Sequence, residues 1–219
     1  MTNVAAGLIE LSLSAERLAP YRHACHGDLD QAIALYEWNV DISTAFWRTL
    51  GQVEVVLRNT LHERLAAWST STYRESRWYL DPANVLTLQA RDDIAKARQR
   101  ATRAGRDETP GRVVAELNFG FWRFLLARRY ERTLRMPAIR AAFPRHHGIR
   151  RDVDNVLAQL HQLRNRIAHH EPIHAHDLPA LRTHAVDLVD WISPDARQWI
   201  DHRCEIQAVL ERRPTTTMA

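Results

Sequence analysis

The chain has 219 residues, of which 45% are hydrophobic, and a formal net charge of +4 at pH 7. Its 9 prolines and 7 glycines are too few for long irregular linkers, and no apolar run approaches the roughly 20 residues that span a bilayer. The positive charge is compatible with a nucleic-acid partner but is modest, and 29 of the 30 basic residues are arginines.

In chain order, the apolar residues recur every three or four positions, which is the period of helices, and no stretch alternates as strands do. Ser14, Asp28, Thr109, Asp177 and Ser193 are candidate N-caps, and a proline follows Thr109 and Ser193. The predicted helices cover residues 14–25, 28–65, 84–104, 110–118, 120–135, 149–170, 177–192 and 194–212.

Two interruptions are predicted in the first half of the chain. The long helix should bend or break near residues 41–44, and residues 69–82 should form a polar connection with aromatic anchors. We therefore expect one all-α domain over residues 1–213, a multi-helix bundle with additional N-terminal and C-terminal helices. The threonine-rich end, residues 214–219, is expected to be a disordered tail.

The N-terminus and the cysteines both favour a cytoplasmic protein without a membrane anchor. Residues 1–14 lack a basic region ahead of their apolar residues, so we expect no signal peptide. Cys25 and Cys204 are expected to be reduced thiols, because two lone cysteines do not form a disulfide framework. Their number also excludes a structural zinc site built on cysteine.

One segment concentrates the residues that carry chemistry: residues 164–173 read Arg-Asn-Arg-Ile-Ala-His-His-Glu-Pro-Ile. The segment ends the predicted helix over 149–170, since its proline prevents a smooth continuation. Asn165 and His169 are four residues apart and therefore share a helix face, with His161 one turn earlier. The long side chain of Arg164 can reach the same place.

These residue types suit the cleavage of RNA without a metal. Arg164 could neutralise phosphate oxygens as charge builds on them, His169 could transfer a proton, and Asn165 could orient the histidine or hold a phosphate oxygen. The helix dipole and Glu171 would both favour a protonated imidazole at 169. A single copy lacks a second acid–base group, which a two-fold dimer with facing motifs, or His170, could supply.

Two other interpretations of this segment stay open. A charged helix end can be a solvated C-terminus that the dipole favours, with no chemical role. A metal ion could instead bind a histidine cluster, although the spacing matches no known ligand pattern. The members of that cluster would be His169, His170, His174 and His176.

The chain resembles the Abi-like family of abortive-infection proteins, which belongs to the HEPN superfamily of helical nucleases. The resemblance extends from about Ser14 to Ile192. It rests on Arg17-Leu18 with Tyr21, residues 34–39 (Ala-Leu-Tyr-Glu-Trp-Asn), residues 54–59 (Glu-Val-Val-Leu-Arg-Asn), residues 118–122 (Asn-Phe-Gly-Phe-Trp) and residues 163–173. The signature of the superfamily is an Arg, a polar residue and a following His, which maps onto Arg164, Asn165 and His169.

The resemblance implies a helical bundle of HEPN type, a homodimer formed through the motif face and metal-independent RNA cleavage with no cofactor. It also implies a toxin or phage-defence role, with tRNA or mRNA as the substrate and an antitoxin or regulatory partner. The superfamily includes members that bind RNA or a partner without cleaving, so a non-catalytic module is the alternative function.

Several further residues are candidates for supporting the site or binding substrate. Within or near the motif these are His161, Arg166, His170 and Glu171. On the long helix, Glu54, Arg58 and His62 are spaced by four, which favours a simple ion pair. Arg58 and Asn59 could instead contact RNA or brace the motif helix. A basic run over residues 91–106 is typical of a solvated helix face but could follow an RNA backbone.

Overall fold

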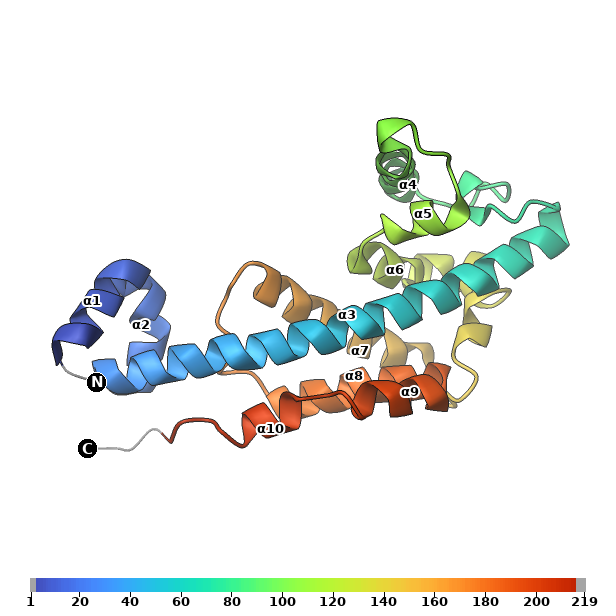
Figure 1. Cartoon of the computed structure of the whole chain (residues 1–219). Coiled ribbons are helices and arrows are strands. Elements are labelled where there is room, and N and C mark those ends of the chain that lie inside the picture. The colour runs from blue at the N-terminus through green and yellow to red at the C-terminus, as the bar shows by residue number, and fades with distance from the viewer. Residues whose placement is uncertain (1–2, 216–219) are drawn as a thin grey trace.

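The computed structural model describes residues 3–215, and it confirms the predicted all-α fold. Figure 1 shows helices stacked along one long central helix, with no strand within the described range. The helices are α1 (Asn3–Leu13), α2 (Ala15–Ala24), α3 (Leu29–Tyr73), α4 (Leu88–Ala101), α5 (Pro110–Ala115), α6 (Phe119–Leu125), α7 (Arg150–Ala168), α8 (Leu178–Ile192), α9 (Pro194–Asp201) and α10 (Ile206–Leu210).

The central helix α3 is continuous over 45 residues, or about 68 Å at 1.5 Å per residue. Of the bend or break predicted near 41–44, the break is therefore wrong. Ile42 in that stretch is fully buried, and the hydroxyl of Thr44 donates to the carbonyl of Val40 (2.9 Å), so the polar side chains are accommodated on the exposed face. The first five residues of the predicted connection, 69–73, are also helical.

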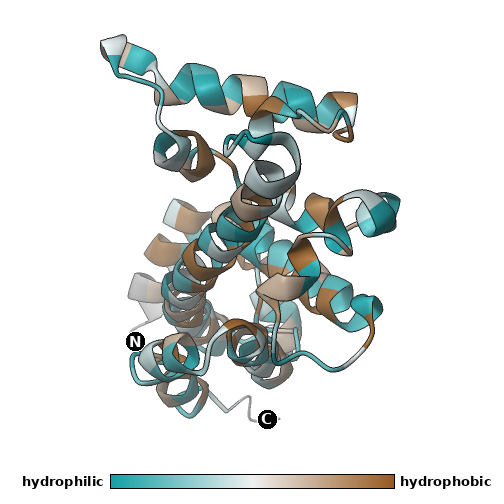
Figure 2. Cartoon of the chain, turned by 90° about the vertical axis from the view of Figure 1, so that its right-hand side faces the viewer, coloured by the Kyte–Doolittle hydropathy of each residue, from teal (hydrophilic) through white to brown (hydrophobic). Residues whose placement is uncertain are grey.

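The core is formed where α2, α7, α8 and α10 pack along α3. The apolar residues spaced three or four apart along α7 form a buried stripe, with Leu157, Leu160 and Leu163 at its centre. Figure 2 looks nearly along α3 and shows polar and apolar residues on different faces of the surrounding helices. The motif at the end of α7 is thus fixed to the central helix by apolar packing.

The predicted N-caps are confirmed. The side chains of Ser14, Asp28, Thr109, Asp177 and Ser193 each accept a hydrogen bond from the backbone N–H three residues later. Helix α1 was not predicted. The predicted tail, 214–219, lies mostly outside the described residues. None of the described helices combines the length and apolar composition that a membrane crossing requires.

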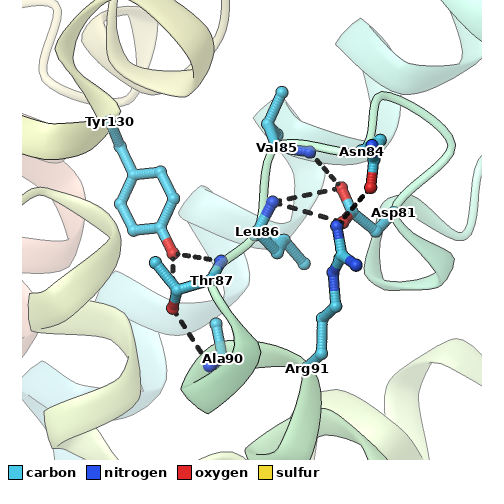
Figure 3. Close-up of polar contacts among 8 residues, drawn as sticks. All are labelled: Asp81, Asn84, Val85, Leu86, Thr87, Ala90, Arg91 and Tyr130. Atoms are coloured by element: carbon cyan, nitrogen blue, oxygen red, sulfur yellow. Dashed lines mark hydrogen bonds and ion pairs between the residues drawn. The ribbon is translucent and has the colours of Figure 1, made fainter.

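A polar network orders the turn before α4, which delays the helix that was predicted to begin at residue 84 (Figure 3). Asp81 adopts a left-handed backbone conformation (φ 56°), and its carboxylate accepts from the N–H groups of Val85 (2.8 Å) and Leu86 (3.2 Å). The same carboxylate pairs with Arg91 at 2.7 Å. These bonds hold the backbone in a turn, because the amides that would start a helix are already used.

Thr87 then begins α4 and ties it to a distant segment. Its hydroxyl accepts from the N–H of Ala90, as an N-cap does, and also accepts from the hydroxyl of Tyr130 (3.2 Å) (Figure 3). The N–H of Thr87 donates to the Tyr130 hydroxyl at 3.1 Å. Tyr130 is therefore held beside α4, which helps explain why the helix predicted over 120–135 does not form as one piece.

Two predicted helices are divided in the structure. Residues 120–135 form α6, the 3₁₀ turn η3 (Arg128–Tyr130) and the π-helical turn η4 (Glu131–Arg135), followed by η5 (Ile139–Ala142). Residues 194–212 form α9 and α10. Ile200 and Ile206 are both fully buried, and on one straight helix they would point about 120° apart, so the break between them lets both reach the core.

Candidate active site

The motif occupies the last turn of α7 and the residues that follow it. His169 is the C-cap, and its N–H donates to the carbonyl of Asn165 at 3.0 Å. His170 adopts a left-handed conformation (φ 56°), which turns the chain back so that the N–H of Glu171 donates to the carbonyl of Arg166 at 2.7 Å. The side chains of His169 and His170 are exposed at this open end of the helix.

Arg164 lies against α3. Its guanidinium carbon lies 5.3 Å from the centre of the Trp47 ring, a cation–π distance. Glu54 of α3 lies near Arg164. Burial raises the pKa of the Glu54 carboxyl, and the positive charges of Arg164 and Arg58 oppose that rise. Glu54 thus lies near the motif and Arg58 lies near Glu54, whereas Asn59 is exposed and its side-chain oxygen accepts from the Arg58 guanidinium at 3.4 Å.

The side chain of Asn165 contacts His161. The amide nitrogen of Asn165 lies 3.2 Å from Nε2 of His161, one turn earlier on the same face. With that amide donating, the ring nitrogen accepts, which requires an unprotonated Nε2. Asn165 therefore positions the half-buried His161, while His169 stays exposed to solvent.

His161 is enclosed between α6 and α7. Its ring stacks on Phe119, with centroids 5.8 Å apart and an interplanar angle of 16°. Gly120 allows this approach, because a Cβ there would stand 3.0 Å from Nε2 of His161. Burial lowers the pKa of His161, and the positive charges of Arg123 and Arg164 lower it further. The imidazole is consequently neutral near pH 7.

Arg166 fastens the loop that follows the motif. Its guanidinium donates to the carbonyl of Pro172 (2.9 Å) and pairs with the carboxylate of Glu171 (3.2 Å). The expectation that Glu171 would stabilise a protonated His169 therefore does not match the contacts, because the left-handed turn folds Glu171 back over Arg166. Arg166 and Glu171 shape the loop that presents His169 and His170.

Two residues whose roles sequence reasoning missed hold the same loop. Asn39 of α3 is 5% exposed, and its carbonyl oxygen accepts from the N–H groups of Ile173 (2.9 Å) and His174 (3.0 Å). Arg17 of α2 donates to the carbonyl of His170. Both lie in segments that carry the family resemblance, which was the available signal, but no spacing in the sequence predicts a contact across more than 130 positions.

All five segments that carry the resemblance meet at this site. Arg17 and Asn39 bind the loop, Glu54 lies beside Arg164, and Phe119 stacks on His161 of the motif helix. A cavity of about 410 Å³ opens beside them between α2, α3 and the end of α7. Its lining includes Arg17, Tyr36, Trp47, Ile167, His170 and Glu171. The arrangement offers a partly apolar recess, lined by one basic and one acidic side chain, next to an exposed imidazole.

The alternative of a histidine metal site is not supported by the geometry. His174 is buried, with its ring 4.8 Å from that of Tyr21, so it does not point toward His169 in solvent. Within residues 3–215, no three His, Cys, Asp or Glu side chains form a group that could hold a metal ion.

The basic run over 91–106 is largely neutralised by ion pairs. The pairs are Arg91–Asp81, Lys96–Asp92, Arg98–Glu108 and Arg100–Glu116, all at 2.7 to 2.9 Å. Among the aromatic residues after Asn118, Phe119, Phe121 and Trp122 are buried, whereas Phe124 is 58% exposed. The ion pairs favour a solvated face for the basic run, and the exposure of Phe124 leaves one aromatic ring open for contact.

We expect the protein to lose stability as the pH falls below about 6.5. Burial is the main cause that lowers the pKa of five histidines, which therefore bind protons more readily in the unfolded chain: His62, His146, His161, His174 and His176. The stability that the neutral imidazoles contribute is fully present above pH 6.5, the ordinary pKa of histidine. It is lost as the pH falls through the lowered pKa values of the folded chain.

Urea unfolding at pH 7.5 and pH 5.5 tests this. His174→Phe, which keeps a ring against Tyr21, should reduce the difference in unfolding free energy between the two pH values, whereas a change at the exposed His202 should not. An unfolding free energy that is constant or larger at pH 5.5 would contradict the prediction.

Comparison with known families gives one match: the family described as Abi-like protein, over residues 16–175. The match covers more than half of the chain and includes all five segments of the site. No curated protein and no solved structure matches.

Proposed function

The chain belongs to the Abi-like protein family, and from that membership we propose that it is an abortive-infection effector that cleaves RNA. The observation that carries the proposal is that Arg164, braced by Trp47, and the exposed His169 lie five residues apart at the open end of α7. We also propose that the fold is of HEPN type, that the substrate is cytoplasmic tRNA or mRNA, and that an antitoxin or regulatory partner restrains the activity.

The proposed reaction uses the 2′-hydroxyl of the RNA as the nucleophile. A neutral His169 removes its proton, the oxygen attacks the adjacent phosphorus, and the bond to the 5′-oxygen breaks as that oxygen receives a proton from a second histidine. Arg164 stabilises the negative charge that builds on the non-bridging oxygens. The products are a 2′,3′-cyclic phosphate and a 5′-hydroxyl, and no metal ion takes part.

We propose that the second histidine is the same residue in a second copy of the chain. His161 is unsuited to the role, because its Nε2 is engaged by Asn165 and its half-buried ring stacks on Phe119. An apolar face beside Arg164 supports a dimer here: Val40, Trp47 and Val55 of α3 are 42 to 46% exposed and lie seven and eight residues apart, on one side of the helix.

Incubation with tRNA and mRNA in EDTA tests the activity. Fragments with 5′-hydroxyl ends, which polynucleotide kinase labels without prior phosphatase treatment, are expected. RNA that is bound but gains no new ends would instead identify the non-catalytic alternative.

The dimer makes a separate prediction. Val55→Arg places a charge on the exposed apolar face and is expected to shift the protein to a monomer and to lower the cleavage rate per chain at least tenfold, at unchanged helicity. Leu88→Arg is the matched control, because Leu88 is 84% exposed on α4, away from the motif. Sedimentation and cleavage assays over a concentration series report both quantities. A monomeric Val55→Arg protein with full activity would contradict the proposal that two copies of the chain share the active site.

A further inference from the structure

The chain concentrates its positive charge in one segment, residues 123–151, here called the arginine-rich connection. It contains nine arginines and one acidic residue, Glu131, so its formal charge is +8 whereas the whole chain carries +4. The remaining residues are therefore net negative. Such a separation of charge creates a local positive field that the overall composition does not reveal.

Three of the nine arginines are neutralised within the fold. Their pairs are Arg135–Glu131 (3.0 Å), Arg150–Asp154 (3.1 Å) and Arg145–Asp190 (3.5 Å). The other six have no ion-pair partner among residues 3–215: Arg123, Arg128, Arg129, Arg132, Arg140 and Arg151. Five of these are exposed, and Arg123 lies over the ring of the exposed Phe124 at 5.5 Å. The contrast with the paired run over 91–106 shows that arginine content alone does not produce this surface.

The connection begins beside the motif helix and extends to its far end. Helix α6 starts where Phe119 stacks on His161 and finishes near Arg150, whose guanidinium donates to the carbonyl of Leu126. Figure 1 shows the connection, in yellow, at the opposite end of α7 from the motif. From Arg150 to His169 the helix rises about 28 Å, which equals roughly eight nucleotides of a stacked strand.

We propose that the arginine-rich connection binds the phosphate backbone of the RNA substrate about eight nucleotides from the bond that is cut. Exposed guanidiniums without carboxylate partners suit phosphate oxygens, which they contact through two parallel N–H groups. The open ring of Phe124 offers a face on which one base can stack along the way. Such contacts read charge and not sequence, so the connection contributes affinity while the motif sets the position of the cut.

The inference rests on the proposed function, and a binding assay separates the two. In the His169→Ala background, in which cleavage is strongly slowed, Arg128→Gln, Arg129→Gln and Arg132→Gln are combined. For a 20-nucleotide RNA at 0.15 M salt, the affinity by fluorescence anisotropy should fall at least tenfold, and the slope of log K against log salt should become shallower by about two. A five-nucleotide RNA should bind equally well to both proteins, since it is too short to span from motif to connection.

The matched control removes three exposed arginines elsewhere: Arg64→Gln, Arg74→Gln and Arg103→Gln. It should leave the affinity and the slope for the long RNA close to those of the parent. Equal binding of the long RNA by the connection variant and the parent would overturn the inference while leaving RNA cleavage by the native chain intact. A connection variant that binds RNA as the parent does but no longer binds a protein partner would also overturn it. So would a parent protein that does not bind the RNA.

Discussion

Replacing His169 by alanine should lower the rate of RNA cleavage by about 10²- to 10⁴-fold, because the exposed imidazole would no longer transfer protons to and from the reacting oxygens. Arg164→Ala should cost about 10²- to 10³-fold, since the phosphate charge would lose its guanidinium. Each rate is measured with a saturating RNA substrate in EDTA, together with growth of cells that express the protein.

Folding should be unaffected by the His169 change, because that side chain is exposed and makes no packing contact that the helix needs. Thermal unfolding of His169→Ala close to that of the native chain therefore excludes a structural cause. His202→Ala removes a similarly exposed histidine on another element and should keep full activity. Cleavage and toxicity that persist in both motif variants would show that these residues are not the catalytic pair.

The second large effect is expected at Asn39. Its carbonyl oxygen accepts two backbone N–H groups in a buried position, so Asn39→Ala leaves the amides of Ile173 and His174 without a partner. Each unpaired buried amide costs about 1 to 3 kcal/mol, and the free energy of unfolding should fall by roughly 2 to 4 kcal/mol. The loop after the motif should loosen, so cleavage should also fall at temperatures where the variant remains folded.

Two further variants make the Asn39 prediction specific. Asn59→Ala changes the same residue type on the same helix at an exposed position and should have little effect on the urea midpoint. Asn39→Asp keeps the accepting oxygen and should be milder than alanine. An Asn39→Ala protein that unfolds at the same urea concentration as the native chain would show that these bonds do not stabilise the fold.

Local signals were enough to predict where five of the helices begin, namely α2, α3, α5, α8 and α9. A capping side chain and the backbone N–H that donates to it lie three residues apart in the sequence, so Thr109 and Ser193 could be read directly. The apolar stripe of α7 was equally predictable, since its period is set by one helix and one core.

Predictions failed where tertiary packing decides. The polar residues at 41–44 suggested a break, but α3 continues because Ile42 is buried in the core. The break between α9 and α10 depends on two isoleucines that must both face that core.

The chemical residues of the candidate site could be proposed from the sequence, but their supports could not. Arg164, Asn165 and His169 lie within one helical turn and a half, where spacing specifies which faces they share. Asn39 and Arg17 reach the motif from segments more than 130 positions away, and only the folded chain shows that they hold its loop. The pairing of Glu171 with Arg166 likewise depends on the backbone turn at His170.

The helices beyond the recognised family region have a structural consequence for that region. The match ends at residue 175, yet the indole of Trp38, next to Asn39, donates to the carbonyl of Val209 at 2.8 Å. Helix α8 covers α3 and α7 with buried residues such as Leu188. A chain shortened at 175 would leave these faces in water and prone to aggregation. The region that matches the family, residues 16–175, is therefore smaller than the folded unit that keeps its motif in place.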